Sequence, residues 1–225
     1  MSLDREQLAL VVHDLKNPLA ALLSNLGFVL SAVRSDAMTA EAVEDCLLST
    51  EVLSRLIENL AVVGQFDERP GVLDAAVQLG DVFQSVASRM KPHLETSGLS
   101  WHFDCPSELP SVQGHDAMLE LALDNLISAS MVYAPAGSMV SVTARAEAPG
   151  VVVTITDEGP AVDAELRQQV FTKAGQGACK TVRGGRYGRG LGLFVVGLIV
   201  SRCGGTLELD EVDSRYCCRL RLVAR

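Results

Sequence analysis

The sequence has few of the features that mark secreted, membrane-spanning or nucleic-acid-binding proteins. Its 225 residues include 19 lysines and arginines against 28 aspartates and glutamates, which gives a net charge of −9. That balance argues against a nucleic-acid partner, because phosphate binding requires a basic face. No apolar run reaches the roughly 18 uncharged residues of a membrane span, and no signal peptide precedes the first predicted helix. We therefore expect a cytoplasmic chain, or the cytoplasmic part of a longer protein, without membrane contact.

Cysteine spacing excludes two further classes of protein. The six cysteines contain no pair separated by two residues and show no metal-site spacing with the four histidines. Reduced thiols are expected rather than a disulfide framework or a metal centre. The hydrophobic fraction of 48% and the charged fraction of 21% are typical of a globular protein. The cysteines are Cys46, Cys105, Cys179, Cys203, Cys217 and Cys218.

Apolar residues with helical spacing dominate the first third of the chain. They predict one helix over Asp4–Arg34 and a second over Ala40–Gly64, joined by a polar break at Asp36–Thr39 with Thr39 as the N-cap. A lone hairpin cannot bury its apolar stripe, whereas two copies packed as a four-helix bundle can. The pattern therefore predicts a homodimer. The stripes comprise Leu8, Val12, Leu15, Leu19, Leu22, Leu26 and Val29 or Leu30, then Val43, Leu47, Thr50, Leu53, Leu56 or Ile57, Leu60 and Val63.

Short β-rich segments and helical segments follow a charged linker at Asp67–Gly71. Their irregular order predicts a mixed sheet covered by helices on one face, so that the whole chain is α+β. We place the domains at residues 1–66 and 72–225. The predicted strands are Val72–Val77, Leu99–Asp104, Met139–Ala146, Val151–Thr156, Thr206–Leu209 and Tyr216–Val223, and the predicted helices are Leu79–Ser97, Ala117–Val132, Asp163–Val170 and Gly192–Cys203.

The segment H-D-L-K-N-P-L, from His13 to Leu19, places a histidine beside an acid in the first predicted helix. Asp14 can take the Nδ1 proton and leave Nε2 of His13 as a nucleophile. Asn17 follows one turn later on the same face and can orient a water or a phosphoryl group. Pro18 removes a backbone donor in mid-helix and is expected to bend the helix there.

A second motif, G-R-G-L-G-L at Gly188–Leu193, follows about 175 residues later and is preceded by D-E-G-P at Asp157–Pro160. An aspartate at a strand end can accept a hydrogen bond from an exocyclic amine, and Gly159 allows a base to approach closely. Glycines at a helix start form a phosphate cradle from backbone donors. A P-loop is excluded because no Lys-Ser or Lys-Thr follows. The cradle comprises Gly188, Gly190, Leu191 and Gly192.

Together these motifs resemble those of two-component sensor histidine kinases, whose ATP-binding domain is shared with gyrase, chaperone and mismatch-repair ATPases. The resemblance implies that His13 is phosphorylated, that Asp14 is the base and that Asn17 serves phosphatase activity on a response regulator. It also implies a dimeric four-helix bundle and ATP as cofactor, with Asp157 contacting the adenine amine. Thr172–Tyr187 would form a mobile lid whose cations include Lys173, Lys180, Arg183 and Arg186.

The Asn box of that family, N-L-L-x-N-A-x-K-Y, is only partly present. Asn125 and Tyr133 match it. The second asparagine, a Mg²⁺ ligand in the family, is replaced by Ala129, and the lysine is replaced by Val132. Alanine offers no oxygen to a hard cation, so Asn125, one turn earlier, is the remaining candidate ligand.

Two functions stay open on this basis. The first is a kinase core that phosphorylates His13 from ATP and passes the phosphoryl group to an aspartate of a response regulator, with phosphatase activity in reverse. The second is a phosphotransferase or pseudokinase relay that does not itself use ATP, because of Ala129. We favour the kinase, because the adenine aspartate and the phosphate glycines remain. A gyrase-type ATPase is disfavoured, because Asn125 occupies the position of its catalytic glutamate.

Overall fold

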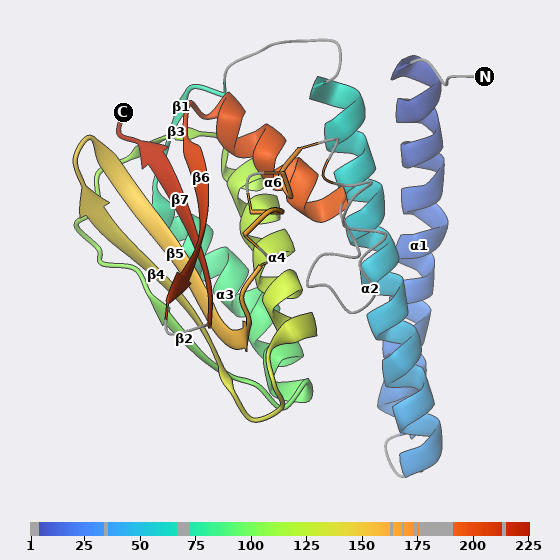
Figure 1. Cartoon of the computed structure of the whole chain (residues 1–225). Helices are drawn as coiled ribbons and strands as arrows, with labels where there is room; N and C mark the ends of the chain where they lie inside the picture. Colours follow the sequence, from blue (N-terminus) through green and yellow to red (C-terminus); the bar gives the residue numbers. More distant parts are fainter. Residues whose placement is uncertain are drawn as a thin grey trace. The chain divides into compact units, whose positions relative to one another are not determined.

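The structure, a computed structural model, describes residues 5–33, 36–66, 73–162, 164–167, 169–172, 175, 191–212 and 215–225. The chain divides into two compact units, Met1–Pro70 and Gly71–Arg225. Figure 1 shows a pair of long helices in the first unit and a sheet with helices in the second. Among the described residues, no helix is long and apolar enough to cross a membrane.

Two antiparallel helices form the first unit. Helix α1 spans Arg5–Val33 and helix α2 spans Ala37–Phe66, and they pack along each other. Val12 and Leu19, both in the predicted stripe of α1, are buried. Pro18 lies inside α1 without ending it. The helical N-terminal region of the predicted fold class is confirmed.

Much of the predicted stripe of this hairpin remains open to solvent. Leu15 and Leu22 of α1 are 44% and 50% exposed, and Leu53 and Leu56 of α2 are 50% and 44% exposed. Burial of apolar area contributes roughly 25 cal/mol per Å². A single hairpin therefore leaves apolar area exposed whose burial would stabilise it further.

Asp36, rather than Thr39, caps α2, and the predicted N-cap is wrong. The helix begins at Ala37, so Thr39 lies in its first turn. The N–H of Ala40 donates to the carbonyl of Asp36 at 2.9 Å, and the Thr39 hydroxyl donates to Asp36 Oδ2 at 2.6 Å. That hydroxyl, followed by the Thr39 N–H, holds the pKa of the Asp36 carboxyl below its usual value. Aspartate caps helices at least as well as threonine, and the helix starts at the first capping residue available.

Replacing Asp36 by alanine is expected to lower the helical content and the melting temperature at neutral pH. Because the folded-state pKa of Asp36 is depressed, its contribution is complete above the unfolded pKa of about 3.9 and is lost as the pH falls through the folded pKa. The difference between circular dichroism melts of wild type and D36A should therefore narrow as the pH is lowered from 7 to 3. Glu44→Ala, at an exposed position of α2, is the control, and a D36A difference independent of pH would contradict the capping role.

In the described part of the second unit, a five-stranded mixed sheet has the order β2-β4-β5-β7-β6. Strand β2 runs parallel to β4, and the other neighbours are antiparallel. A separate pair, β1 with β3, was predicted only in part, since β3 was missed. The strands are β1 Ala75–Val77, β2 Ser100–Asp104, β3 Val112–Gly114, β4 Met139–Glu147, β5 Gly150–Pro160, β6 Thr206–Val212 and β7 Arg215–Val223.

Helices cover one face of this sheet, which confirms the predicted sandwich. They are α3 (Leu79–Thr96), α4 (Asp116–Tyr133) and α6 (Leu191–Arg202), and Figure 1 shows them on the same side. The helix predicted at Asp163–Val170 is wrong, because residues 164–167 and 169–171 form turns. This segment offers too few apolar positions to stabilise a helix of its own.

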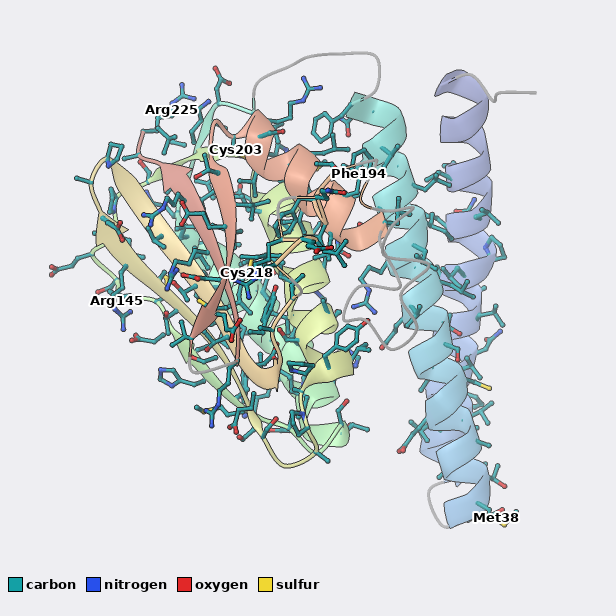
Figure 2. All side chains as sticks on the ribbon, in the orientation of Figure 1. Met38, Arg145, Phe194, Cys203, Cys218 and Arg225 are labelled. Carbon is teal, nitrogen blue, oxygen red and sulfur yellow. The ribbon has the colours of Figure 1, made fainter. Side chains whose placement is uncertain are left out.

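The core lies between the sheet and the helices, and the opposite face of the sheet is polar. Val142, Ile155 and Leu126 are fully buried, from β4, β5 and α4 in turn. On the other face Arg145 pairs with Asp104, and Figure 2 shows Arg145 pointing away from the helices. That polar face needs no covering layer.

The described cysteines, Cys46, Cys105, Cys203, Cys217 and Cys218, are free thiols, while Cys179 lies outside the described residues. Burial raises the pKa of Cys203 to about 11, which keeps this thiol protonated and unreactive. Figure 2 shows Cys203 and Cys218 in the interior of the second unit.

Candidate functional site

The candidate phosphoacceptor lies on the solvent side of the hairpin. His13 is exposed on α1, directly after the buried Val12, and Asn17 is exposed one turn later. A partner can therefore reach both side chains from the same side. Asp14 also lies in α1, but its side chain is not among those described. The roles of these three residues stay predictions.

Those predicted nucleotide residues of the second unit that the structure describes lie toward one end of its sheet. The register of Ser141 with Thr156 places the start of β4 beside the end of β5. Helix α4 ends shortly before β4 begins and therefore ends at this edge. Helix α6 leads into β6, whose first residue pairs near the C-terminal end of β7, and that end of β7 lies beside the start of β5. Helix α6 therefore ends at the opposite end of the sheet and begins at this edge. The topology thus brings together the C-terminal half of α4, the end of β5 and the start of α6.

Asp157 is a buried acceptor at this edge, with 3% of its surface exposed. Its Oδ1 accepts the N–H of Gly159 at 2.8 Å, and the register with β7 shifts between Asp157 and Pro160. The D-E-G-P segment therefore lies in an irregular end of β5, not after the strand as predicted. The hydrogen bond fixes the direction of the carboxylate, which suits it to recognise an amine.

Asn125 and Gly192 are in direct contact across α4 and α6. Asn125 is buried, and a Cβ at position 192 would lie 2.9 Å from its Oδ1. Only glycine allows this approach, so the amide of Asn125 is held against the first turn of α6. The sequence predicts Gly192 only as part of a phosphate cradle. The missed signal was a glycine at a position where a helix would tolerate alanine better.

The remaining α4 positions of the family's Asn box lie at the same edge. Ala129 is half-buried and Tyr133 is half-buried, whereas Val132 is 56% exposed. Of the family's two asparagine oxygens, that of Asn125 alone remains. Mg²⁺ commonly takes one or two protein ligands and completes its shell with nucleotide phosphates and water. The residues present therefore fit a metal held mainly by the nucleotide.

The structure describes some of the remaining predicted nucleotide-binding residues and not others. Leu191 opens α6, half-buried, and Gly159 is buried in β5. Lys173, Gly188 and Gly190 lie outside the described residues, as does the segment predicted as a lid from residue 176 onward. Among the described residues, no cluster of three histidine, cysteine or acidic side chains suits a metal ion.

Two family models match the chain, one in each of its two units. The His Kinase A (phospho-acceptor) domain matches residues 3–68, and the histidine kinase-, DNA gyrase B- and HSP90-like ATPase matches residues 114–224. The chain belongs to the sensor histidine kinases. It contains their two-part catalytic core, a phosphoacceptor hairpin followed by the ATPase-like sandwich.

Individual histidine kinases agree with this assignment over most of the chain. The sensor-like histidine kinase SenX3 of Mycobacterium tuberculosis is 26% identical over 208 residues, covering 91% of this chain and 50% of SenX3. The histidine-protein kinase/phosphatase MprB of Mycolicibacterium paratuberculosis is 27% identical over 205 residues, covering 88% and 38%. Full-length ShkA, solved with AMPPNP, has the same fold with a TM-score of 0.66 and 22% identity, covering 99% and 47%. The chain spans about half the length of these relatives or less.

Proposed function

We propose that this histidine kinase core phosphorylates His13 from ATP and passes the phosphoryl group to an aspartate of a response regulator receiver domain. One observation carries the proposal. A single chain combines an exposed histidine on a phosphoacceptor helix with a site in which Asp157, Asn125 and the start of α6 converge. We propose domain borders of residues 1–66 and 72–225, and a homodimer that covers the open side of the hairpin.

The nucleotide would lie where the C-terminal half of α4, the end of β5 and the start of α6 come together in the second unit. Asp157 would accept the adenine amine, and Gly159 would leave room for the base. The start of α6, at Leu191 and Gly192, would direct backbone N–H groups and the positive end of the helix dipole at the phosphates. Tyr133, at the end of α4, would border the base or sugar.

In the phosphorylation step, Nε2 of His13 attacks the γ-phosphorus in line. An N–P bond forms, the bond to the bridging oxygen breaks, and ADP leaves with that electron pair. Asp14 accepts the Nδ1 proton, so that the phosphorylated imidazole stays neutral. Bound Mg²⁺, held by Asn125 and the phosphates, would neutralise charge on the phosphate oxygens.

Asn17 would act in the reverse, phosphatase, direction. It is exposed one turn after His13, where its amide can orient a water toward a receiver aspartyl phosphate. The relative MprB, named both kinase and phosphatase, supports a core with both activities. Because His13 and Asn17 are exposed on the helix surface, the partner would be a receiver domain rather than a small molecule.

The direct test is incubation of the chain with γ-labelled ATP and Mg²⁺. The label should enter the protein as a phosphoramidate, which is lost in acid and kept in base. It should then move to a receiver domain that carries its phosphoacceptor aspartate. A chain that takes no label from ATP but accepts it from a phosphorylated receiver would be a relay, which would refute the kinase proposal.

Replacing Ala129 by asparagine is expected to strengthen the effect of Mg²⁺ on ATP affinity by roughly tenfold, because an added amide oxygen suits a hard cation. Calorimetry with ATP, with and without Mg²⁺, measures the change. Ala117→Asn, at an exposed position in the first turn of α4, is the matched control. Equal metal dependence in A129N and wild type would show that residue 129 does not face the nucleotide phosphates.

A further inference from the structure

The turn that follows β5 is held in one conformation by its own hydrogen bonds. Val170 is fully buried. The Thr172 hydroxyl donates to the carbonyl of Gln169 at 2.8 Å and accepts the N–H of Gly175 at 3.1 Å. These two hydrogen bonds tie Thr172, the residue after Phe171, to the main chain of the turn.

Gly197, in the middle of α6, lies directly under this turn. A Cβ at position 197 would overlap the carbonyl oxygen of Phe171 and lie 3.1 Å from the Phe171 Cβ. A glycine inside a helix is about 1 kcal/mol less favourable than alanine. Its presence here allows the backbone of Phe171 to rest on the backbone of α6, which no other residue would permit.

Helix α6 joins this contact to the nucleotide edge. Gly192 precedes Gly197 by five residues, or roughly 7.5 Å along the helix axis. At Gly192 the helix touches the Asn125 side chain, and a Cβ there would force that amide to shift. The same helix is thus held by Asn125 of α4 near its start and by Phe171 in its middle, and a shift at one contact moves the other.

We propose that Gly197 and Phe171 form a positioning contact that sets where the start of α6 lies and so aims its backbone donors at the nucleotide phosphates. The inference rests on the proposed nucleotide site and adds two residues that touch no nucleotide themselves. A misplacement of about 1 Å at such a site can lower binding or rate by one or two orders of magnitude. Asp157, at the end of β5, would contact the base independently of this contact.

The test compares ATP with adenosine as ligands of Gly197→Ala in the full chain, using calorimetry for ATP and ligand-observed NMR for adenosine. We expect ATP affinity to fall roughly tenfold, with adenosine affinity changed less than about twofold, because only the phosphates depend on α6. Gly80→Ala is the matched control, since a Cβ at this helical position of α3 meets nothing within 4 Å. It should leave both affinities unchanged.

Phe171→Gly gives a second, independent variant that introduces no overlap. It removes the Cβ that lies against Gly197 and frees the main chain of the turn, so it should show the same selective loss of ATP affinity. If G197A does not fold, as judged by circular dichroism, F171G alone decides. A parallel loss for ATP and adenosine, or no loss for either, would overturn the positioning role. Absence of ATP binding by the wild-type chain would instead refute the proposed nucleotide site.

Discussion

Replacing His13 by alanine is expected to abolish transfer of the γ-phosphate from ATP to the chain, by at least about a thousandfold, as is common when a nucleophile is removed. The imidazole is exposed on α1, whereas ATP would bind in the second unit. ATP affinity should therefore stay unchanged within about twofold, since no proposed nucleotide contact is lost. Label incorporation over time, beside calorimetry with ATP, measures both quantities.

A matched control separates this histidine from the others in the chain. His102→Ala removes an exposed imidazole from β2 and should leave the labelling rate unchanged. Far-UV circular dichroism should match wild type for both variants, since neither side chain is buried. If H13A still took an acid-labile label, the phosphoacceptor would lie elsewhere and the role assigned to α1 would be wrong.

Replacing Asp157 by asparagine is expected to weaken ATP binding by about ten- to hundredfold, since a hydrogen bond to a charged group contributes about 1.5–3 kcal/mol. The substitution keeps the size of the side chain and an oxygen that can still accept the N–H of Gly159. It replaces the second carboxylate oxygen with a donor, which would face the donor of the adenine amine. Calorimetry with ATP measures the loss directly.

Glu158→Gln is the control for this variant. It makes the same chemical change one residue later, at an exposed side chain, and should leave ATP affinity unchanged. Inosine triphosphate carries an oxygen in place of the adenine amine, and D157N should bind it more tightly than wild type does. Equal ATP affinities in D157N and wild type would show that Asp157 does not recognise the base.

Periodicity predicted the long elements well because their stability depends on a repeated pattern. Helices α1 and α2 and strands β4 and β5 carry apolar residues over enough positions that single exceptions do not matter. Shorter elements depend on their surroundings. Strand β3 has three residues and forms against β1, so no local pattern marks it. The segment from Asp163 to Val170 has a short helical pattern but too little apolar surface to form a helix alone.

The candidate site was predictable in its residue types and not in its packing. Asp157, Asn125 and Gly192 are predicted through the resemblance to sensor histidine kinases. The contacts of Gly192 with the Asn125 side chain and of Gly197 with the Phe171 backbone could not be, because each depends on a distance between two elements that only the folded chain defines. The choice of Asp36 over Thr39 as cap shows a limit of a different kind, since both residues suit the role.

The open side of the hairpin has a thermodynamic consequence for the proposed dimer. With Leu15, Leu22, Leu53 and Leu56 half in water, the hairpin gains its missing stabilisation only from a second chain. Its free energy of unfolding then depends on protein concentration by mass action, while the second unit, whose described core residues are buried within it, is expected to unfold independently of concentration. Dilution would therefore unfold the helices that present His13 and leave the nucleotide site intact. The rate of phosphotransfer would then depend on the concentration of the protein itself.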